Sequence, residues 1–154
     1  MEHSLVPFHV SIELRRIGFN DPCVAWFVEP GKVLYASIDS GQFLYDKSRL
    51  VKNSSLPLEI CTCPTYEQVF DWFENTHGMY LSYYPDLHAR WVEYNYQIRW
   101  YLPKEQWTFT KKYKLYTNVS DGTSWKGDGN IKSKKTMYCD AIDAMIEITK
   151  DKKI

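Results

Sequence analysis

Residues 64–78 read PTYEQVFDWFENTHG and lead directly into MYLSYY at residues 79–84. Thr65 and Gln68 have the spacing of a capping box, in which each side chain bonds the backbone N–H of the other residue, so a helix is expected to begin here. Gly78 is the residue type that ends a helix in the left-handed conformation. The apolar stripe between these two signals consists of Tyr66, Val69, Phe70 and Phe73. The stretch therefore predicts one helix followed at once by an aromatic strand.

The second decisive stretch, residues 91–102, alternates between two kinds of side chain. One parity consists of Val92, Tyr94, Tyr96, Ile98, Trp100 and Leu102. A period of two predicts an antiparallel strand that is buried on one face only. Residues 91–102 would span about 40 Å when fully extended, which is longer than an ordinary strand and predicts a bulge or a bend.

Similar signals predict further elements. Ser11 is placed to cap a short helix of residues 11–17, which Gly18 would end. Glu29-Pro30-Gly31 predicts a turn between two strands, and Pro85-Asp86 predicts the end of another. Residues 46–63 show no period and are expected to form an irregular connection. Strands are predicted at residues 23–28, 32–38, 42–45, 79–84 and 107–116, and an amphipathic helix closes the chain at residues 137–150.

These elements predict an α+β fold. We expect a mainly antiparallel sheet of about four to six strands, with two long helices at about residues 65–77 and 137–150 and the short N-terminal helix packed on it. The 154 residues predict a single globular domain, 1–154. Residues 118–135 are rich in Gly, Ser, Asp and Lys and predict a mobile loop.

The chain lacks the features of membrane and secreted proteins. No apolar run approaches the roughly 18 residues that span a bilayer. The first residues, MEHSL, have neither the basic nor the apolar region of a secretory signal. We therefore expect a cytoplasmic protein with no membrane association, in which the cysteines stay reduced.

The four cysteines, Cys23, Cys61, Cys63 and Cys139, are expected to be small buried thiols. Two other interpretations remain open. The four thiols could share one zinc ion, although the spacing of Cys61 and Cys63 is shorter than that of a zinc knuckle. Alternatively, Cys61 or Cys63 lies near the start of the predicted helix, where a lowered thiol pKa would suit a small thiol-dependent hydrolase.

No other group of reactive side chains has the further residues that a catalytic or metal site would need. Glu74 and His77 have the ExxH spacing of di-metal carboxylate sites, but such sites use the pair twice and the chain has it once. We therefore predict no catalytic residue, no metal and no cofactor, and expect that the chain is not an enzyme.

Residues 104–135 hold eight Lys against three acidic residues, with aromatic residues between them. Lys can neutralise phosphates and aromatic rings can stack on bases, so this segment is a candidate nucleic-acid site. The other interpretation is a solvated sheet face and loop, with Lys112 and Lys114 on the wet face, Lys111 interrupting the inner row and Trp125 packed on the sheet. The candidate site residues are Lys111, Lys112, Lys114, Trp125, Lys126, Lys132, Lys134 and Lys135.

Two stretches carry a family resemblance: LRRIGFNDPC at residues 14–23 and PTYEQVFDWF at residues 64–73. Together they resemble small proteins from phages and mobile elements of Bacteroidetes, a group with no assigned activity that often closes with a C-terminal amphipathic helix. The resemblance covers about half of the chain and implies a phage or mobile-element context. It carries over no functional residue, and the long segment 118–135 departs from the short connection expected there.

The leading functional hypothesis is a non-catalytic accessory or protein-interaction module with an unidentified protein partner. Nucleic-acid binding through residues 107–135 is the alternative, and a small thiol-dependent hydrolase is the second alternative. Trp72 and Trp91 are expected on the outer faces of their elements, where they either form a dimer contact or are covered by the long loops.

Overall fold

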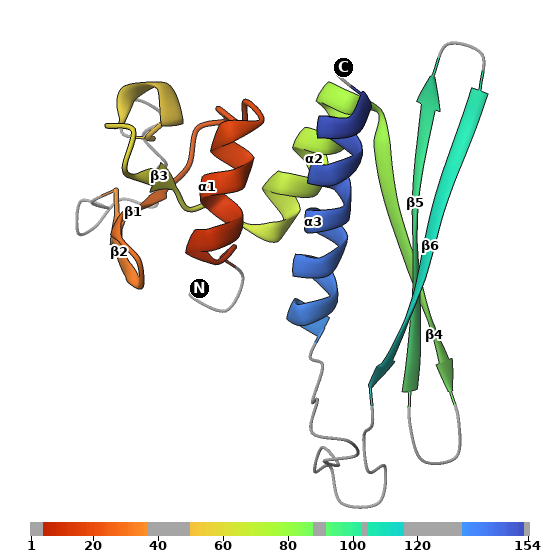
Figure 1. The fold of residues 1–154 in the computed structure, drawn as a ribbon. Coiled ribbons are helices and arrows are strands. Elements are labelled where there is room, and N and C mark those ends of the chain that lie inside the picture. Colours follow the sequence, from red (N-terminus) through yellow and green to blue (C-terminus); the bar gives the residue numbers. More distant parts are fainter. Residues whose placement is uncertain (1–4, 37–49, 88–91, 103–104, 116–133, 153–154) are drawn as a thin grey trace, which may run out of the picture. The chain divides into compact units, whose positions relative to one another are not determined.

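The computed structural model describes residues 5–36, 50–87, 92–102, 105–115 and 134–152. The elements in chain order are α1 (Phe8–Arg16), β1 (Ala25–Glu29), β2 (Lys32–Tyr35), a 3-10 turn (Asn53–Ser55), β3 (Cys61–Thr62), α2 (Tyr66–His77), β4 (Met79–Leu87), β5 (Val92–Leu102), β6 (Glu105–Leu115) and α3 (Lys134–Lys152) (Figure 1). The predicted strand at residues 42–45 and the predicted loop up to residue 133 lie outside the described residues.

The chain groups into two compact units, one of Met1–Trp72 with Ile148–Ile154 and one of Phe73–Glu147. The first unit holds an antiparallel sheet of order β2-β1-β3, and the second holds one of order β4-β5-β6. The predicted α+β class is confirmed, whereas the strands are divided between two sheets instead of one. The single-domain organisation of residues 1–154 stays a prediction.

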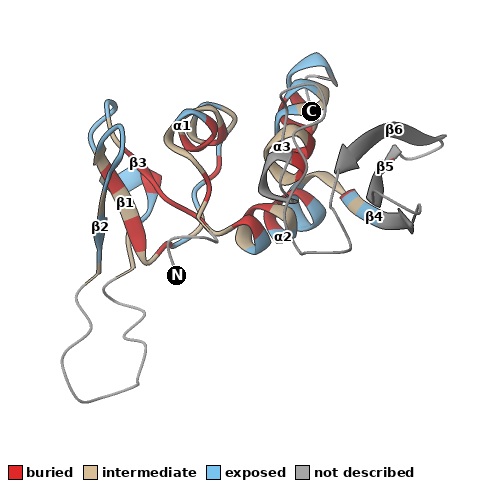
Figure 2. Ribbon diagram, turned by 90° about the horizontal axis from the view of Figure 1, so that it is seen from below, coloured by how far each residue is buried: buried red, intermediate tan, exposed pale blue. Residues whose placement is uncertain are grey.

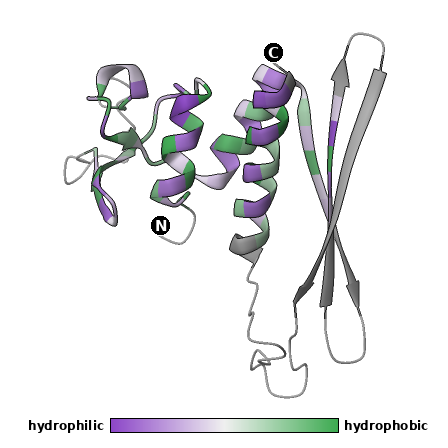
Figure 3. Cartoon of the chain, viewed as in Figure 1, coloured by the Kyte–Doolittle hydropathy of each residue, from purple (hydrophilic) through white to green (hydrophobic). Residues whose placement is uncertain are grey.

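Helix α1 begins earlier than expected. Ser11 does not cap it: the helix starts directly after Pro7, and Ser11 lies buried within it, with its Oγ donating to the carbonyl oxygen of Val6 at 3.4 Å. The buried residues of the helix are Val10, Ser11 and Leu14, so Ser11 lies on its inner face, and α1 carries buried residues along one side (Figure 2). Both hydrophobic and hydrophilic residues occur along α1 (Figure 3).

The predicted end of α1 at Gly18 is confirmed. Gly18 has a φ of 101°, a conformation that side chains with a Cβ rarely adopt. Its N–H donates to the carbonyl oxygen of Arg15 at 3.1 Å, and the N–H of Phe19 donates to that of Leu14 at 2.9 Å. This is a Schellman motif, and its two apolar positions, Phe19 and Leu14, are both buried.

The N-terminal sheet confirms the predicted hairpin of β1 and β2, with Gly31 at φ 81° in the turn between them. The irregular connection predicted for residues 46–63 is wrong at its end, because β3 pairs with the second edge of β1. This strand comprises only two residues, too few to show a period in the sequence. The ring of Phe8 on α1 meets that of Phe27 on β1 edge-on at 5.3 Å.

The capping box that opens α2 is confirmed in both directions. The N–H of Gln68 donates to Thr65 Oγ1 at 3.2 Å, and the N–H of Thr65 donates to Gln68 Oε1 at 3.1 Å. The expected outer position of Trp72 is wrong, because this ring is buried and contacts Phe19 edge-on at 5.4 Å. Trp72 therefore belongs to the core of the first unit and is no candidate for a dimer contact, while Trp91 lies outside the described residues.

In the second unit, β5 pairs with β4 on one side and with β6 on the other without a register shift. The predicted bulge is therefore absent from the described strands, which twist across one another instead (Figure 1). The predicted turn at Pro85-Asp86 is also wrong, because Pro85 lies inside β4 and pairs with Tyr94 of β5. Proline lacks an N–H, and an edge strand such as β4 tolerates it.

The predicted alternation along β5 is confirmed where side chains are described: Tyr96, Ile98 and Trp100 are buried and Arg99 is exposed. Helix α3 starts before the predicted residue 137 and ends after the predicted residue 150. Its buried residues are Met137, Ala141, Ile142, Met145 and Ile146, with Thr149 one turn further on. The hydroxyl of Tyr96 donates to Asp140 Oδ2 on α3 at 2.5 Å, so a buried strand residue is tied to this helix.

Candidate functional site

Three of the four thiols lie buried in the first unit. Cys61 and Cys63 belong to one apolar cluster with Ala25 and Phe27, and Cys23 is equally buried. Cys23 donates to the carbonyl oxygen of Asp21 across 3.4 Å, and Cys63 donates to that of Val6 across 3.6 Å. These positions confirm the expectation of small buried thiols for three of the four residues; the fourth, on α3, is half-buried.

Burial also decides the protonation of these thiols. It raises the pKa of Cys23 and of Cys61 to about 11 and the pKa of Cys63 to about 12. The side chain of Thr62 beside Cys23 and the charge of Arg15 near Cys61 favour the thiolates, but burial outweighs both. The lowered pKa expected near the start of α2 is therefore wrong. These thiols are therefore protonated at neutral pH. Because the thiolate is the nucleophile, they are poor nucleophiles.

The ExxH pair does not form a metal site in the described part of the structure. Glu74 is exposed, while His77 is half-buried with its ring 5.9 Å from that of Phe73. Burial lowers the pKa of His77, although its position at the end of a helix would favour the cation. Among the described residues, no group of three or more His, Cys, Asp or Glu side chains is placed to hold a metal ion.

The residues of the predicted nucleic-acid site are only partly placed. Lys111, Lys112 and Lys114 lie on β6, where their Cα partners on β5 are Tyr96, Asn95 and Glu93. Lys134 and Lys135 form the first turn of α3. The side chains of these five lysines, and the whole of Trp125, Lys126 and Lys132, lie outside the described part of the structure.

A cation that the sequence did not single out fixes a surface turn. The guanidinium of Arg15, on the last turn of α1, donates to the carbonyl oxygen of Leu56 at 2.9 Å and also to those of Pro57 and Ile60. The N–H of Ile60 donates to the carbonyl oxygen of Pro57 at 3.3 Å, which closes the turn. We refer to residues 56–60 as the Leu58 turn, after the residue between these anchor points.

Two asparagines hold the segment that precedes the Leu58 turn. Buried Asn53 donates through Nδ2 to the carbonyl oxygen of Phe19 at 2.7 Å and accepts through Oδ1 from the N–H of Thr62 at 2.9 Å. Exposed Asn20 accepts from the N–H of Ser54 at 2.8 Å. No sequence signal marks these contacts, because their acceptors and donors are backbone groups that every residue carries.

Most of the exposed large hydrophobic side chains among the described residues lie on edge strands. Two lie on β2 and two on β4, each of which is an edge strand of its sheet, and the fifth is at the tip of the Leu58 turn. Leu58 is by far the most exposed, at 84%. The described residues of this kind are Leu34, Tyr35, Leu58, Tyr80 and Tyr83. They are the candidate interaction surfaces of the chain.

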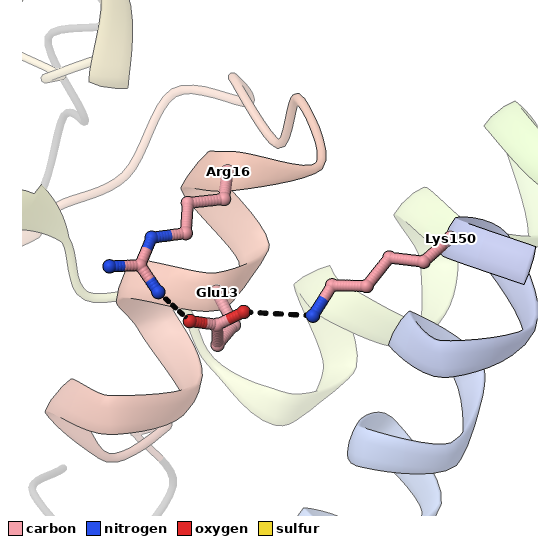
Figure 4. A network of polar contacts seen from close by, with 3 residues as sticks. All are labelled: Glu13, Arg16 and Lys150. Carbon is pink, nitrogen blue, oxygen red and sulfur yellow. Dashed lines mark hydrogen bonds and ion pairs between the residues drawn. The ribbon is translucent and has the colours of Figure 1, made fainter. Parts of the chain in front are cut away.

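One small ion-pair network ties α1 to the C-terminal end of α3. Glu13 accepts through Oε1 from Arg16 and through Oε2 from Lys150 Nζ at 3.0 Å (Figure 4). The hydrogen bond from Lys150 is the main reason that the pKa of Glu13 is lowered. All three side chains are exposed or half-buried, so the network is a surface contact.

In the described residues, no helix combines the length and the apolar character that crossing a bilayer requires. No family model, no curated protein and no solved structure matches this chain.

Proposed function

We propose that the chain is a non-catalytic, cytoplasmic protein-interaction module that pairs with a partner through an exposed edge strand. The observation that carries the proposal is β2, on which the consecutive residues Leu34 and Tyr35 are 43% and 41% exposed. Consecutive strand residues lie on opposite faces of a sheet, so both faces of this edge offer apolar contact. The resemblance to phage and mobile-element proteins supplies the biological context of the proposal.

An edge strand presents unpaired backbone N–H and C=O groups, which an extended segment of another protein can bond by adding a strand. Within the described residues, β2 lies at one edge of its sheet, beside β1. Lys32 at the start of β2 lies 3.7 Å from Glu29 across the turn, and charged residues of this kind limit unspecific edge pairing. The strand is four residues long, which suits a small and transient interface.

The buried chemistry of the first unit supports a non-catalytic role. Cys23, Cys61 and Cys63 stay protonated, and the Arg15 guanidinium is engaged by backbone carbonyl oxygens. These groups are used to build the unit. A thiol-dependent hydrolase receives no support from them.

The test places a photo-crosslinking amino acid at Leu34 in the full chain and, as a control, at exposed Glu67 on α2. A partner that crosslinks from position 34 is identified, purified and titrated against the wild type and against Leu34→Ser/Tyr35→Ser. We expect the double variant to stay folded and to lose about tenfold or more in affinity. Turnover of a substrate by the pure chain, with no partner from either position, would overturn the proposal.

One observation favours nucleic-acid binding as the second candidate function. Tyr80 on β4 and Arg99 on β5 are Cα partners, and both are exposed. An exposed ring beside a guanidinium on an antiparallel sheet suits stacking on an unpaired base. Lys112 and Lys114 belong to the neighbouring strand of the same sheet.

The corresponding measurement is fluorescence anisotropy with a labelled single strand and a labelled duplex between about 50 and about 200 mM salt. Binding should weaken steeply with salt. Arg99→Gln and Lys112→Gln/Lys114→Gln should each flatten the salt dependence, and Tyr80→Ala should weaken the single strand more than the duplex. Absence of binding by both probes at low salt removes this function.

A further inference from the structure

The most exposed apolar side chain of the described residues belongs to a turn whose backbone is held by several hydrogen bonds. Leu58 is 84% exposed, about twice the value of Leu34 or Tyr80. Single exposed leucines are ordinary on protein surfaces and need no explanation alone. What distinguishes Leu58 is the structure that fixes the backbone on both sides of it.

Three sets of contacts hold the Leu58 turn. Arg15 donates to the carbonyl oxygens of Leu56, Pro57 and Ile60, which precede and follow Leu58. The hydrogen bond from Ile60 N–H to Pro57 closes the turn from within. Pro57 further restricts the backbone, because its ring fixes φ.

The two ends of the Leu58 turn are held as well. Ile60 leads directly into β3, which pairs with β1. Leu56 follows the 3-10 turn, whose residues Asn53 and Ser54 bond the segment after α1. A binding loop with a fixed conformation loses little conformational freedom on association, which raises affinity.

The charge around Leu58 indicates the chemistry of the partner. Residues 53–60 contain one ionisable side chain, Glu59, which is exposed beside Leu58. The nearby cation Arg15 is engaged by backbone carbonyl oxygens. The tip therefore presents an apolar side chain next to a negative charge.

We propose that the Leu58 turn is a preformed anchor that inserts Leu58 into an apolar pocket of a partner protein, with a cationic side chain at the pocket rim facing Glu59. The inference rests on the proposed protein-interaction function and names a surface distinct from β2. Anchor residues that fill a desolvated pocket contribute most of the binding free energy of many interfaces, and complementary rim charges raise the association rate.

The first test concerns the rigidity of the turn and needs no partner. Backbone NMR order parameters of residues 58 and 59 should be close to the value of about 0.85 found in rigid backbone, and Arg15→Lys should lower them because an ammonium group lacks the planar fork. Values below about 0.6 in the wild type, typical of flexible loops, would overturn the preformed anchor.

The second test identifies the partner by a photo-crosslinking amino acid at Leu58, with exposed Ser54 as the neighbouring control position. The purified partner is then titrated with the wild type, Leu58→Ala, Glu59→Lys and Leu34→Ser. We expect Leu58→Ala to weaken binding about tenfold or more, and Glu59→Lys to slow association at low salt. Because Leu58 contacts solvent, Leu58→Ala should unfold at the wild-type urea concentration.

The outcomes separate the two proposals. Binding of Leu58→Ala within about twofold of the wild type, combined with loss of binding by Leu34→Ser, overturns the anchor and leaves the edge-strand interaction standing. A crosslinked product of two copies of this chain overturns the pocket on a different protein. Absence of any crosslinked partner from positions 34 and 58 contradicts both.

Discussion

The side-chain amide of Asn53 donates a hydrogen bond to the carbonyl oxygen of Phe19 across 2.7 Å in the interior of the first unit. The same side chain accepts from the N–H of Thr62 at 2.9 Å. One amide thus joins the segment after α1 to β3, and it satisfies one backbone acceptor and one backbone donor that are buried away from water. Such groups are expensive to leave without a partner.

We predict that Asn53→Ala lowers the free energy of unfolding by about 2 to 4 kcal/mol, because it leaves both backbone groups without their side-chain partner. Urea unfolding should show a lower midpoint with an unchanged slope. Asn20→Ala is the matched control: its partner, Ser54 N–H, is exposed, so the expected loss is about 1 kcal/mol or less. Equal losses for both variants would contradict the role assigned to Asn53.

The Glu13–Lys150 pair predicts a pH dependence on the acid side. The folded state lowers the pKa of Glu13, so the unfolded chain takes up the proton first as pH falls. The contribution of the pair is therefore present above the unfolded pKa and is lost as pH falls through the folded one. We expect Lys150→Met to remove about 0.2 to 1 kcal/mol near neutral pH, and this difference should vanish in acid.

The direct measurement for this pair is the carboxyl titration of Glu13 by NMR. Lys150→Met should raise its pKa, and Lys32→Met, which removes a cation paired with Glu29, should leave it unchanged. An unaltered Glu13 titration in Lys150→Met would show that the hydrogen bond does not persist in solution.

The buried thiols predict a loss of stability in alkali. The pKa of a cysteine in the unfolded chain is about 8.5, whereas burial raises the pKa of Cys61 to about 11 in the folded state. The unfolded state therefore loses its proton first as pH rises, and the free energy of unfolding falls by about 1.4 kcal/mol per pH unit for each such thiol between the two values.

Urea unfolding of the wild type and Cys61→Ala from about pH 7 to about pH 10.5 tests this slope. The variant loses some packing at every pH, but its stability should fall less steeply, by the contribution of one thiol. Parallel curves would contradict a buried, protonated Cys61. Comparing the two proteins cancels the titration of tyrosines and lysines.

In the second unit, Tyr96→Phe should destabilise the fold without creating a cavity. The ring of Tyr96 is fully buried and its hydroxyl donates to Asp140 Oδ2, so the substitution removes one charge-assisted hydrogen bond while keeping the ring. We expect a loss of about 1.5 to 3 kcal/mol in thermal or urea unfolding. Tyr83→Phe removes an exposed hydroxyl contact with Tyr138, at 3.0 Å, and should cost about 0.5 kcal/mol or less.

Elements built from near neighbours were predicted well from the residues. The capping box of Thr65 and Gln68 and the ends of helices at Gly18 and Gly78 depend on residues within one or two turns of each other. The alternation of buried and exposed residues along β5 has a period of two, which can be recognised in the sequence of a strand of that length. Ser11 is not the cap, because the helix begins three residues earlier, after Pro7, and Ser11 lies buried within it.

The candidate site depended on contacts between residues far apart in the chain. Arg15 reaches carbonyl oxygens more than 40 positions away, and Asn53 bonds backbone groups on two other segments. Backbone acceptors are identical at every residue, so no pattern marks which of them a side chain will meet. Trp72 was expected on the outer face of its helix, but it is a core residue, because Phe19 from another segment packs against its ring. Periodicity in the sequence indicates local conformation. The exposed fraction of the Leu58 side chain depends on how the rest of the chain folds around it, so only the tertiary structure determines it.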